Sequence, residues 1–278
     1  MEIETLHSNL HRILVPSPTL PPATTTNAWI TADVGGLVVD PAAHTRNNQQ
    51  VLLDRLTEFQ PSAVFLTHHH HDHIGSAQIL RDYFSIPIIS HKKTADLVTF
   101  QVDQLVDEGH QFSTGGDTWT AIHTPGHAPG HLCLLSDADQ SLIAGDMVAG
   151  EGTILINPKE GSIREYIHSL KRLLTFAPSR LLPAHGGALN NADAMLQEYI
   201  SHRKSRILQI WGLLSDTPQS PLDLARKIYT DLPVAYLGMA AIQVHCGLLF
   251  LEQDNATQEV TSTTTGWIRT QSTYSVTM

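Results

Sequence analysis

A run of histidines stands out in this sequence, because the segment from Thr67 to Gly75 reads THHHHDHIG and holds five of the 17 histidines of the chain. An apolar run typical of a buried β-strand, Ala63–Thr67, leads into it, and Ile74–Arg81 has the apolar spacing of a helix. A tag would not be embedded between a strand and a helix. Side chains at a strand end can converge on one point outside the sheet. The segment therefore predicts a metal site.

The spacing within the run separates its histidines into two kinds. In extended backbone, residues two apart face the same side, so His68 and His70 can share one metal ion. His69 and His71 then point elsewhere, and we do not expect them to be ligands.

Other side chains extend this candidate site. Asp72 and His73 follow the turn and can hold a second metal ion. Three later apolar strands each end in one possible ligand, namely His127, Asp146 and His185. Any one of these is typical of an ordinary loop residue, but together they are hard to explain by chance. Imidazole and carboxylate groups are donors that divalent zinc, manganese and iron accept.

The spacing of these residues also matches a known motif. The pattern Thr-His-x-His-x-Asp-His, followed by single His, Asp and His residues at later strand ends, resembles the metallo-β-lactamase superfamily over about residues 10–190. The resemblance implies an α/β fold, a four-layer αβ/βα sandwich with two metal ions at one edge. By the family pattern, the first metal ion is held by His68, His70 and His127, the second by Asp72, His73 and His185, and Asp146 bridges both.

Such a site implies hydrolysis. Two divalent cations that share Asp146 would share a water and lower its pKa enough to supply hydroxide near neutral pH. Asp72 is the expected catalytic residue, since its second oxygen could orient the proton of that hydroxide. Zinc is the expected metal, with manganese or iron as alternatives.

Some polar residues near the motif have more than one interpretation. By family position, Asp40 and His131 could orient the ligands, or each could be an ordinary turn or core residue. His91 could reach the mouth of the pocket, but the two lysines that follow it favour a position at the surface. Cys133 alternates with apolar neighbours in a strand and is expected in the core.

Strand-like runs and helical patterns alternate up to about residue 190, which favours two sheets covered by helices. The first two strands are expected to form a hairpin around Asp33–Gly35. The pattern predicts helices at 49–59, 74–81 and 162–176, and strands at 27–31, 36–40, 63–67, 86–90, 118–123, 131–135, 141–144 and 180–183.

Beyond Asn190 the pattern becomes mostly helical, and two short strands are expected between 258 and 270 around Gly266. This order predicts a winged-helix-like domain over 191–278, after a catalytic domain over 1–190. Residues 150–153 and 191–203 also resemble the β-lactamase-like protein 2 group of the superfamily, which includes fungal polyketide acyl-carrier thioesterases. Members of that group carry such a C-terminal domain. The helices are expected at 192–214, 221–230 and 235–251.

Charge and composition narrow the expected partners and location. The 17 basic and 27 acidic residues give a net charge of −10, which disfavours nucleic acid and anionic lipid surfaces. Two cysteines are too few for a disulfide framework. Met1–Pro16 lacks the pattern of a signal peptide, and Leu237–Leu251 is too short and too polar to span a membrane. We therefore expect a cytoplasmic protein without a membrane partner, with Leu237–Leu251 as a core helix.

The expected function is hydrolysis of a small-molecule or carrier-bound acyl ester, with thioesters as the first choice. One alternative is a single-strand-specific endoribonuclease, in which Arg203, Lys204, Arg206 and Trp211 could hold backbone and bases. Others are a β-lactam or lactone hydrolase, and a non-catalytic module with a structural metal. Seven ligands over two metal ions leave positions for water and substrate, which favours catalysis. The expected partner is the small-molecule or acyl-carrier substrate, and a homodimer stays open.

Overall fold

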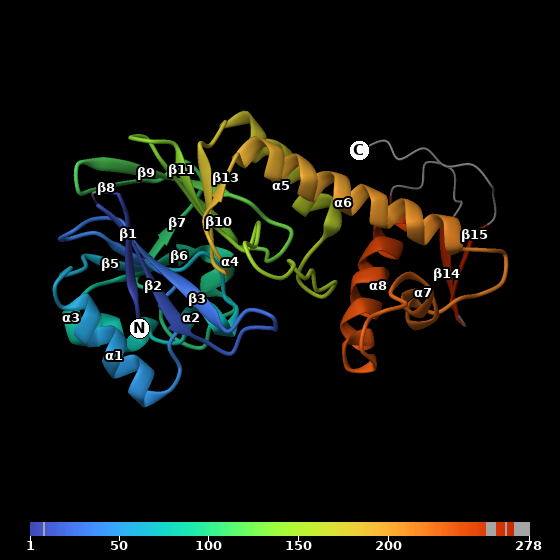
Figure 1. The fold of residues 1–278 in the computed structure, drawn as a ribbon, viewed down its shortest axis with the longest axis horizontal. Coiled ribbons are helices and arrows are strands. Elements are labelled where there is room, and N and C mark those ends of the chain that lie inside the picture. Colours follow the sequence, from blue (N-terminus) through green and yellow to red (C-terminus); the bar gives the residue numbers. More distant parts are fainter. Residues whose placement is uncertain (8, 254–259, 265, 270–278) are drawn as a thin grey trace.

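The computed structural model describes residues 1–7, 9–253, 260–264 and 266–269 of the chain. Its first sheet has seven strands, which lie side by side in the order in which they occur in the sequence (Figure 1). The first four strands pair antiparallel, and the pairs from the fourth strand onward are parallel. These strands are β1 (Ile3–His7), β2 (Leu10–Pro16), β3 (Thr25–Ile30), β4 (Leu37–Val39), β5 (Ala63–Phe65), β6 (Ile88–His91) and β7 (Gln104–Val106).

A second sheet of six strands packs against the first, in the order β13-β12-β11-β10-β9-β8. Only the β11–β12 pair is parallel among these described strands. Buried side chains of both sheets, including Trp29, Phe65, Trp119 and Leu134, form one hydrophobic cluster between them. The strands are β8 (Gln111–Thr114), β9 (Asp117–His123), β10 (Leu132–Ser136), β11 (Ser141–Gly145), β12 (Arg180–Pro183) and β13 (Leu189–Asn190).

Helices cover the outer face of each sheet. On the first sheet, α1 (Arg46–Leu56) and α3 (Ala77–Phe84) bury Leu52, Leu56 and Leu80 against the strands. On the second sheet, α5 (Ile163–Thr175) buries an apolar stripe that includes Leu170 and Leu173. The side chain of Ser162 accepts a hydrogen bond from the Glu165 backbone and caps the first turn of α5. Together with the short helices α2 (His71–Ile74) and α4 (Lys92–Ala95), these elements make the predicted four-layer αβ/βα sandwich.

The C-terminal part contains the predicted helices followed by a two-stranded ribbon. The long helix α6 runs from the second sheet to this part of the molecule (Figure 1). One hydrophobic cluster joins α5 to the C-terminal helices, so the two parts share a continuous core. A winged-helix-like domain over 191–278 stays a prediction, and residues 258, 259, 265 and 270 of the predicted ribbon lie outside the described residues. The elements are α6 (Ala192–Leu213), α7 (Pro221–Ile228), the 3-10 turn η1 (Val234–Tyr236), α8 (Leu237–Gln253), β14 (Val260–Thr263) and β15 (Gly266–Arg269).

Helix α8 differs in length from the expected apolar stretch. Residues 234–253 form a continuous helical stretch that is long and apolar enough to cross a membrane by length and composition, with a mean hydropathy of 1.8. In the structure, 39% of this stretch is buried inside the protein. Its buried residues, such as Val244, Leu248 and Leu251, belong to the hydrophobic cluster that also contains residues of α6 and α7. The expectation that this stretch is too short and too polar to span a membrane is therefore wrong by length and composition, while its buried residues pack into the core of the protein.

Candidate metal centre

The seven predicted ligands all follow or begin secondary-structure elements at one edge of the sandwich. His68 and His70 lie between β5 and α2, and α2 itself carries Asp72 and His73. The other three come from the second sheet: His127 lies in the loop after β9, Asp146 directly follows β11, and His185 lies just after β12. The structure brings all seven together in two groups that meet at Asp146.

The first group joins three imidazole rings and one carboxylate. His68 Nε2 and His127 Nε2 are each 2.9 Å from His70 Nδ1, and they lie 3.2 Å from each other. Asp146 Oδ2 lies 3.3 Å from His127 Nε2. Tetrahedral coordination with Zn–N bonds of 2.0–2.1 Å separates ligand nitrogens by about 3.3 Å. The spacing of the four donors therefore fits one small divalent cation.

The second group uses the other oxygen of Asp146. Asp146 Oδ1 lies 3.6 Å from His73 Nε2 and 3.5 Å from His185 Nε2. Asp72 completes this group, with Oδ2 3.4 Å from His185 Nε2 and Oδ1 3.9 Å from His73 Nε2. Asp146 thus presents one oxygen to each group, which is the arrangement that the family resemblance implied.

Hydrogen bonds at the outer nitrogens of the five rings set their tautomers. In each ring the nitrogen that faces away from the group lies against an acceptor, so that nitrogen carries the proton and the inner nitrogen keeps its lone pair. The outer contacts are His73 Nδ1 with Asp40 Oδ2 (2.8 Å), His127 Nδ1 with the Leu155 carbonyl (2.7 Å), His185 Nδ1 with the Thr25 carbonyl (3.0 Å), His70 Nε2 with Glu160 Oε1 (3.3 Å) and His68 Nδ1 with Thr67 Oγ1 (2.9 Å).

The donor set fits a pair of divalent cations. In their neutral forms, with the outer nitrogens protonated, the five imidazoles direct their lone pairs inward, where a neighbouring lone pair offers no hydrogen-bond donor. Two buried atoms of the cluster, His73 Nε2 and Asp146 Oδ1, have no hydrogen-bond partner. Buried acceptors without partners are costly, and a cation satisfies them. Nitrogen and oxygen donors of this kind suit Zn²⁺, Mn²⁺ or Fe²⁺.

The pKa values of the rings in the metal-free protein differ between the two groups. Burial lowers the pKa of His127 to about 4 although the Asp146 carboxylate opposes it. Burial likewise places the pKa of His68 well below its ordinary value. For His73 and His185 burial acts in the same direction, but the surrounding carboxylates, Asp146 and Asp72 among them, outweigh it and raise the pKa of both rings.

Asp40 and His131, whose roles the sequence left open, both contact the site. Asp40 is buried and accepts hydrogen bonds from the Thr67 backbone, the Thr67 hydroxyl and His73. His131 Nε2 accepts the backbone N–H of Asp146 at 3.1 Å. Gly145, with φ +49°, makes this contact possible, because a Cβ there would lie 2.5 Å from His131 Nε2.

His91 is buried, so the expectation that it lies at the surface is wrong. Its Nδ1 accepts the Lys93 backbone N–H and caps α4, and its ring stacks on His123 with the centroids 4.5 Å apart. The capping hydrogen bond holds the His91 ring inside the protein, while the two lysines that follow it face solvent.

His69 and His71 lie outside both groups of predicted ligands. His69 Nε2 lies 2.7 Å from Glu160 Oε2, and His71 packs against the ring of His44. Glu160, which the sequence did not single out, bridges His69 and the metal-facing His70. No periodic signal marks Glu160, because it lies in an irregular loop far from the histidine run in the sequence.

The loop segment 153–156 is a second feature that the sequence did not predict. Its Leu155 carbonyl orients His127. The C-terminal helices hold the residues on either side: Arg203 of α6 donates to the Ile154 carbonyl, and Gln243 of α8 exchanges two hydrogen bonds with the Ile156 backbone. Helices outside the sandwich therefore fix one of the candidate metal ligands.

Comparison with known proteins agrees with this geometry. The family model described as "Metallo-beta-lactamase superfamily" matches residues 22–185. A β-lactamase domain protein from Burkholderia ambifaria has the same fold, with a TM-score of 0.84 and 19% identity over 97% of this chain and 94% of that one.

Two curated relatives are similar over most of the chain. The β-lactamase-like protein 2 homolog of Caenorhabditis elegans is 28% identical over 74% of this chain and 70% of its own length. The atrochrysone carboxyl ACP thioesterase of Aspergillus fumigatus is 27% identical over 75% of this chain and 66% of its own length. The chain spans about half the length of the fungal lactamase-like relatives that it matches. The chain therefore belongs to the metallo-β-lactamase superfamily, whose members are generally hydrolases.

Proposed function

We propose that this protein is a zinc-dependent hydrolase of small-molecule or carrier-bound acyl esters, with acyl thioesters as its substrate class. The observation that carries the proposal is the pair of donor groups joined by Asp146. When bound there, two divalent cations supply an acidified water as nucleophile and polarise the carbonyl of the substrate. Similarity to a fungal acyl-carrier thioesterase supports the choice of thioesters.

The side chains of the protein favour water as the nucleophile. Burial raises the pKa of the Cys133 thiol to about 12 and that of the Cys246 thiol to about 11, so neither is a thiolate at neutral pH. The donor set has seven members for two cations, which leaves coordination positions for water and substrate.

Asp72 is the proposed catalytic residue. Its side chain is partly exposed, in contrast to the fully buried His73 beside it. The Thr26 hydroxyl donates to its backbone carbonyl, which fixes the start of α2 against β3. One carboxylate oxygen faces His185, and in this proposal the other holds and orients a proton of the attacking water.

A panel of substrates tests the proposal. The purified protein, with its zinc content measured by mass spectrometry, is assayed on an acyl thioester, a lactone, a β-lactam and a single-stranded RNA. We expect the acyl thioester to give the highest kcat/KM. An RNA or β-lactam activity that exceeds the thioesterase activity would contradict the proposal.

Replacing the Asp72 carboxylate tests its role. The Asp72→Asn variant keeps the size and one oxygen of the side chain but removes the proton acceptor. We expect kcat to fall by roughly 10²- to 10⁴-fold, the usual contribution of a positioned base, when the variant is assayed at a zinc concentration that loads it to the metal content of the wild type. Asp82→Asn, an exposed aspartate on α3, is the matched control and should keep full activity. Unchanged turnover in Asp72→Asn would remove the assigned role.

A further inference from the structure

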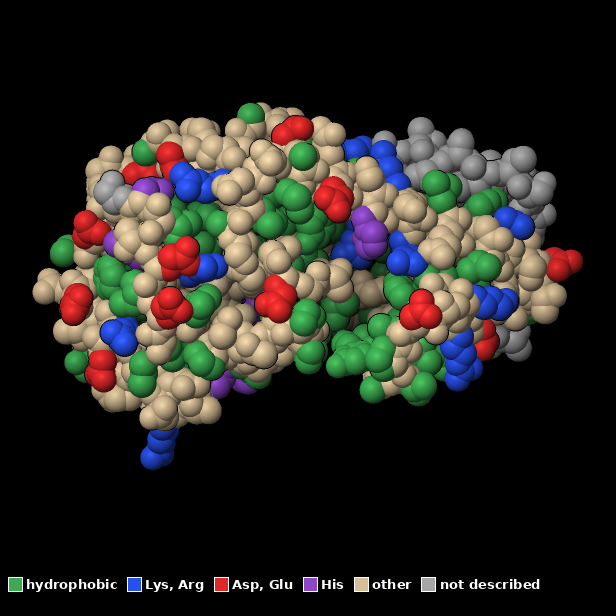
Figure 2. Space-filling model, viewed as in Figure 1, with side chains coloured by type: hydrophobic (Ala, Val, Ile, Leu, Met, Phe, Trp, Pro, Cys, Tyr) green, Lys and Arg blue, Asp and Glu red, His purple; other side chains and the backbone are tan. Residues whose placement is uncertain are grey.

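A cavity of about 240 Å³ lies between α6, α8 and the loop segment 153–155. Arg203 and Arg206 of α6 line it together with His202, and Tyr229 lies beside them. None of its lining residues is an aspartate or glutamate. Figure 2 shows Lys, Arg and His side chains over the middle of α6, with an acidic side chain near them, beside a hollow between the two halves of the molecule.

The two arginines of this cavity have no acidic partner among the described residues. Arg203 is only 7% exposed, donates to the Ile154 carbonyl and lies over the Tyr166 ring, and its Nε has no hydrogen-bond partner. The Arg206 guanidinium lies 4.5 Å from the centre of the Tyr229 ring. Burial first, and then these two cations, lower the pKa of His202. Glu198, one turn before His202 on α6, acts on its pKa in the opposite direction. Arg206 also donates to Gln209 Oε1. The cavity therefore presents two guanidinium groups, neither of which forms an ion pair with a described carboxylate.

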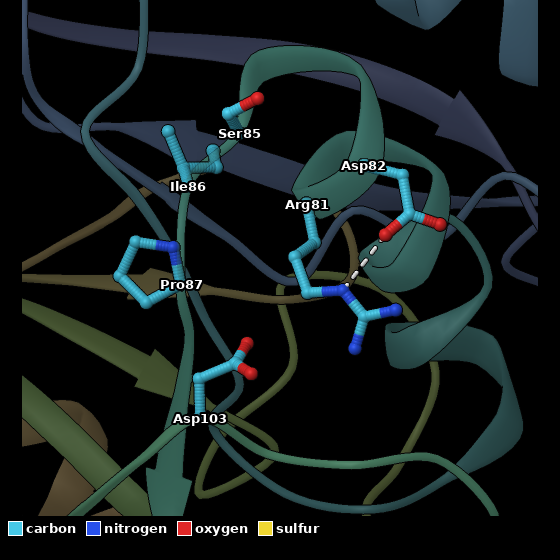
Figure 3. A pocket seen from close by; sticks show the side chains of 6 residues that line it. All are labelled: Arg81, Asp82, Ser85, Ile86, Pro87 and Asp103. Atoms are coloured by element: carbon cyan, nitrogen blue, oxygen red, sulfur yellow. Dashed lines mark hydrogen bonds and ion pairs between the residues drawn. The ribbon is translucent and has the colours of Figure 1, made fainter.

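A second cavity provides a contrast. It lies at the end of α3 and is lined by residues that include Arg81, Asp82 and Asp103 (Figure 3). There the Arg81 Nε donates to Asp82 Oδ1 at 2.9 Å, and the Asp103 carboxylate lies on the opposite wall. The cation in that cavity is neutralised by the protein itself. Arg203 and Arg206 lack this compensation, although Arg203 is far more deeply buried.

A buried cation without a partner is unfavourable unless a ligand supplies the opposite charge. The remaining wall of the α6 cavity is largely apolar, with Ile154, Ile163, Ile207 and Ile210. From these features we propose that the cavity binds a small organic anion, with its anionic head against Arg203 and Arg206 and its apolar body against the isoleucines. At about 30 Å³ per water-sized group, the volume accommodates roughly eight non-hydrogen atoms.

The cavity is joined to the candidate metal centre through two successive carbonyl groups. Arg203 donates to the Ile154 carbonyl, and the next carbonyl, that of Leu155, accepts from the metal-facing His127. Ile154 and Leu155 also line the cavity. An anion that binds Arg203 therefore contacts a residue that is hydrogen-bonded to the segment that orients His127.

Binding of hexanoate, which has eight non-hydrogen atoms, tests the proposal by isothermal titration calorimetry on the metal-loaded protein. We expect a Kd on the order of 1 mM for a ligand of this size. Neutral 1-hexanol and short-chain acetate should each bind at least about tenfold more weakly, because the first lacks the charge and the second lacks the apolar body. Equal binding of hexanol, or of acetate, would overturn the proposal.

A pair of variants on one helix locates the site. Arg206→Gln removes a partly exposed cation from the cavity and should weaken hexanoate binding about tenfold. Lys204→Gln removes the same charge from α6 at a position that does not line the cavity, and it should change Kd less than about twofold. Thermal unfolding checks that both variants fold. Equal affinities of Arg206→Gln and wild type in these conditions would refute the assignment.

Kinetics distinguish the two sources of such an anion. If the cavity holds the far end of the substrate itself, hexanoate raises KM and leaves kcat unchanged. If it holds a separate effector, hexanoate changes kcat. The calorimetric result does not require turnover, so failure of the anion site and failure of the proposed hydrolase activity are observed separately.

Discussion

The two halves of the candidate metal centre are held by different parts of the molecule. The outer nitrogens of His73 and His185 contact Asp40 and the Thr25 carbonyl, which belong to the first sheet or follow it directly. Those of His70 and His127 contact Glu160 and the Leu155 carbonyl, both in the loop before α5. The half with His73 and His185 is fixed by the sandwich. In the other half, His68 is also held by the sandwich through Thr67, whereas His70 and His127 are held by a loop that the C-terminal helices brace.

Asp40 offers the strongest way to break this comparison, because its carboxylate accepts three hydrogen bonds inside the protein. We expect Asp40→Asn to lower the affinity for the metal ion near His73 by about 10- to 100-fold. The variant should also lower the free energy of unfolding by about 1–3 kcal/mol. Competition with a chelator measures the affinity, and urea unfolding measures the stability.

A matched carboxylate is available as the control for Asp40. Asp117 also accepts three hydrogen bonds, from Ser136, Thr118 and Ala138, but belongs to neither donor group. Asp117→Asn should cost stability without changing metal affinity. If Asp40→Asn lowered the affinity for both metal ions equally, the division of the centre into separately supported halves would be wrong.

Glu160 provides a smaller and more local change. Glu160→Gln keeps the size of the side chain but removes the charge opposite His70, so we expect about a tenfold loss of affinity for the metal ion of the first group only. Glu108→Gln, at an exposed glutamate that pairs with Arg172, is the control. Loss of the other metal ion at the same chelator concentration would contradict the assignment of Glu160 to the first half.

A pH titration sharpens the comparison without any substitution. In the metal-free protein the pKa of His127 is lowered to about 4, whereas the pKa of His185 is raised. His127 therefore destabilises the fold as the pH falls from about 6.5 toward 4, because the unfolded chain binds the proton more readily. His185 stabilises the fold below about pH 6.5. This contribution is lost as the pH rises through the raised pKa that His185 has in the folded protein. NMR of the imidazole rings should show His185 charged at pH values where His127 is neutral; the reverse order would contradict the two environments.

Some ligands could be predicted from the sequence because they follow apolar strands, and the complete set of seven came from the resemblance to the superfamily motif. His68, Asp146 and His185 carry this local signal, and parallel strands bring such ends to one edge. Glu160 and Arg203 carry no such signal. Their contacts depend on how an irregular loop and a distant helix pack, which local patterns do not encode.

The elements show the same limit. The strands next to the motif were predicted, whereas β1 and β2 were not, because Met1–Pro16 mixes charged and apolar residues. The short strands β7, β8 and β13 were also missed. A strand of two to four residues is defined by its partner rather than by its own sequence.

The hydrogen bonds from Arg203 and Gln243 to the loop segment 153–156 have a consequence for any shortened form of the protein. Both donors lie beyond Asn190, so a chain cut at the end of the second sheet would retain all seven metal donors but lose the groups that brace the Leu155 carbonyl behind His127. The residues that bind the metal ions and the residues that hold His127 in position are therefore encoded in different stretches of the sequence.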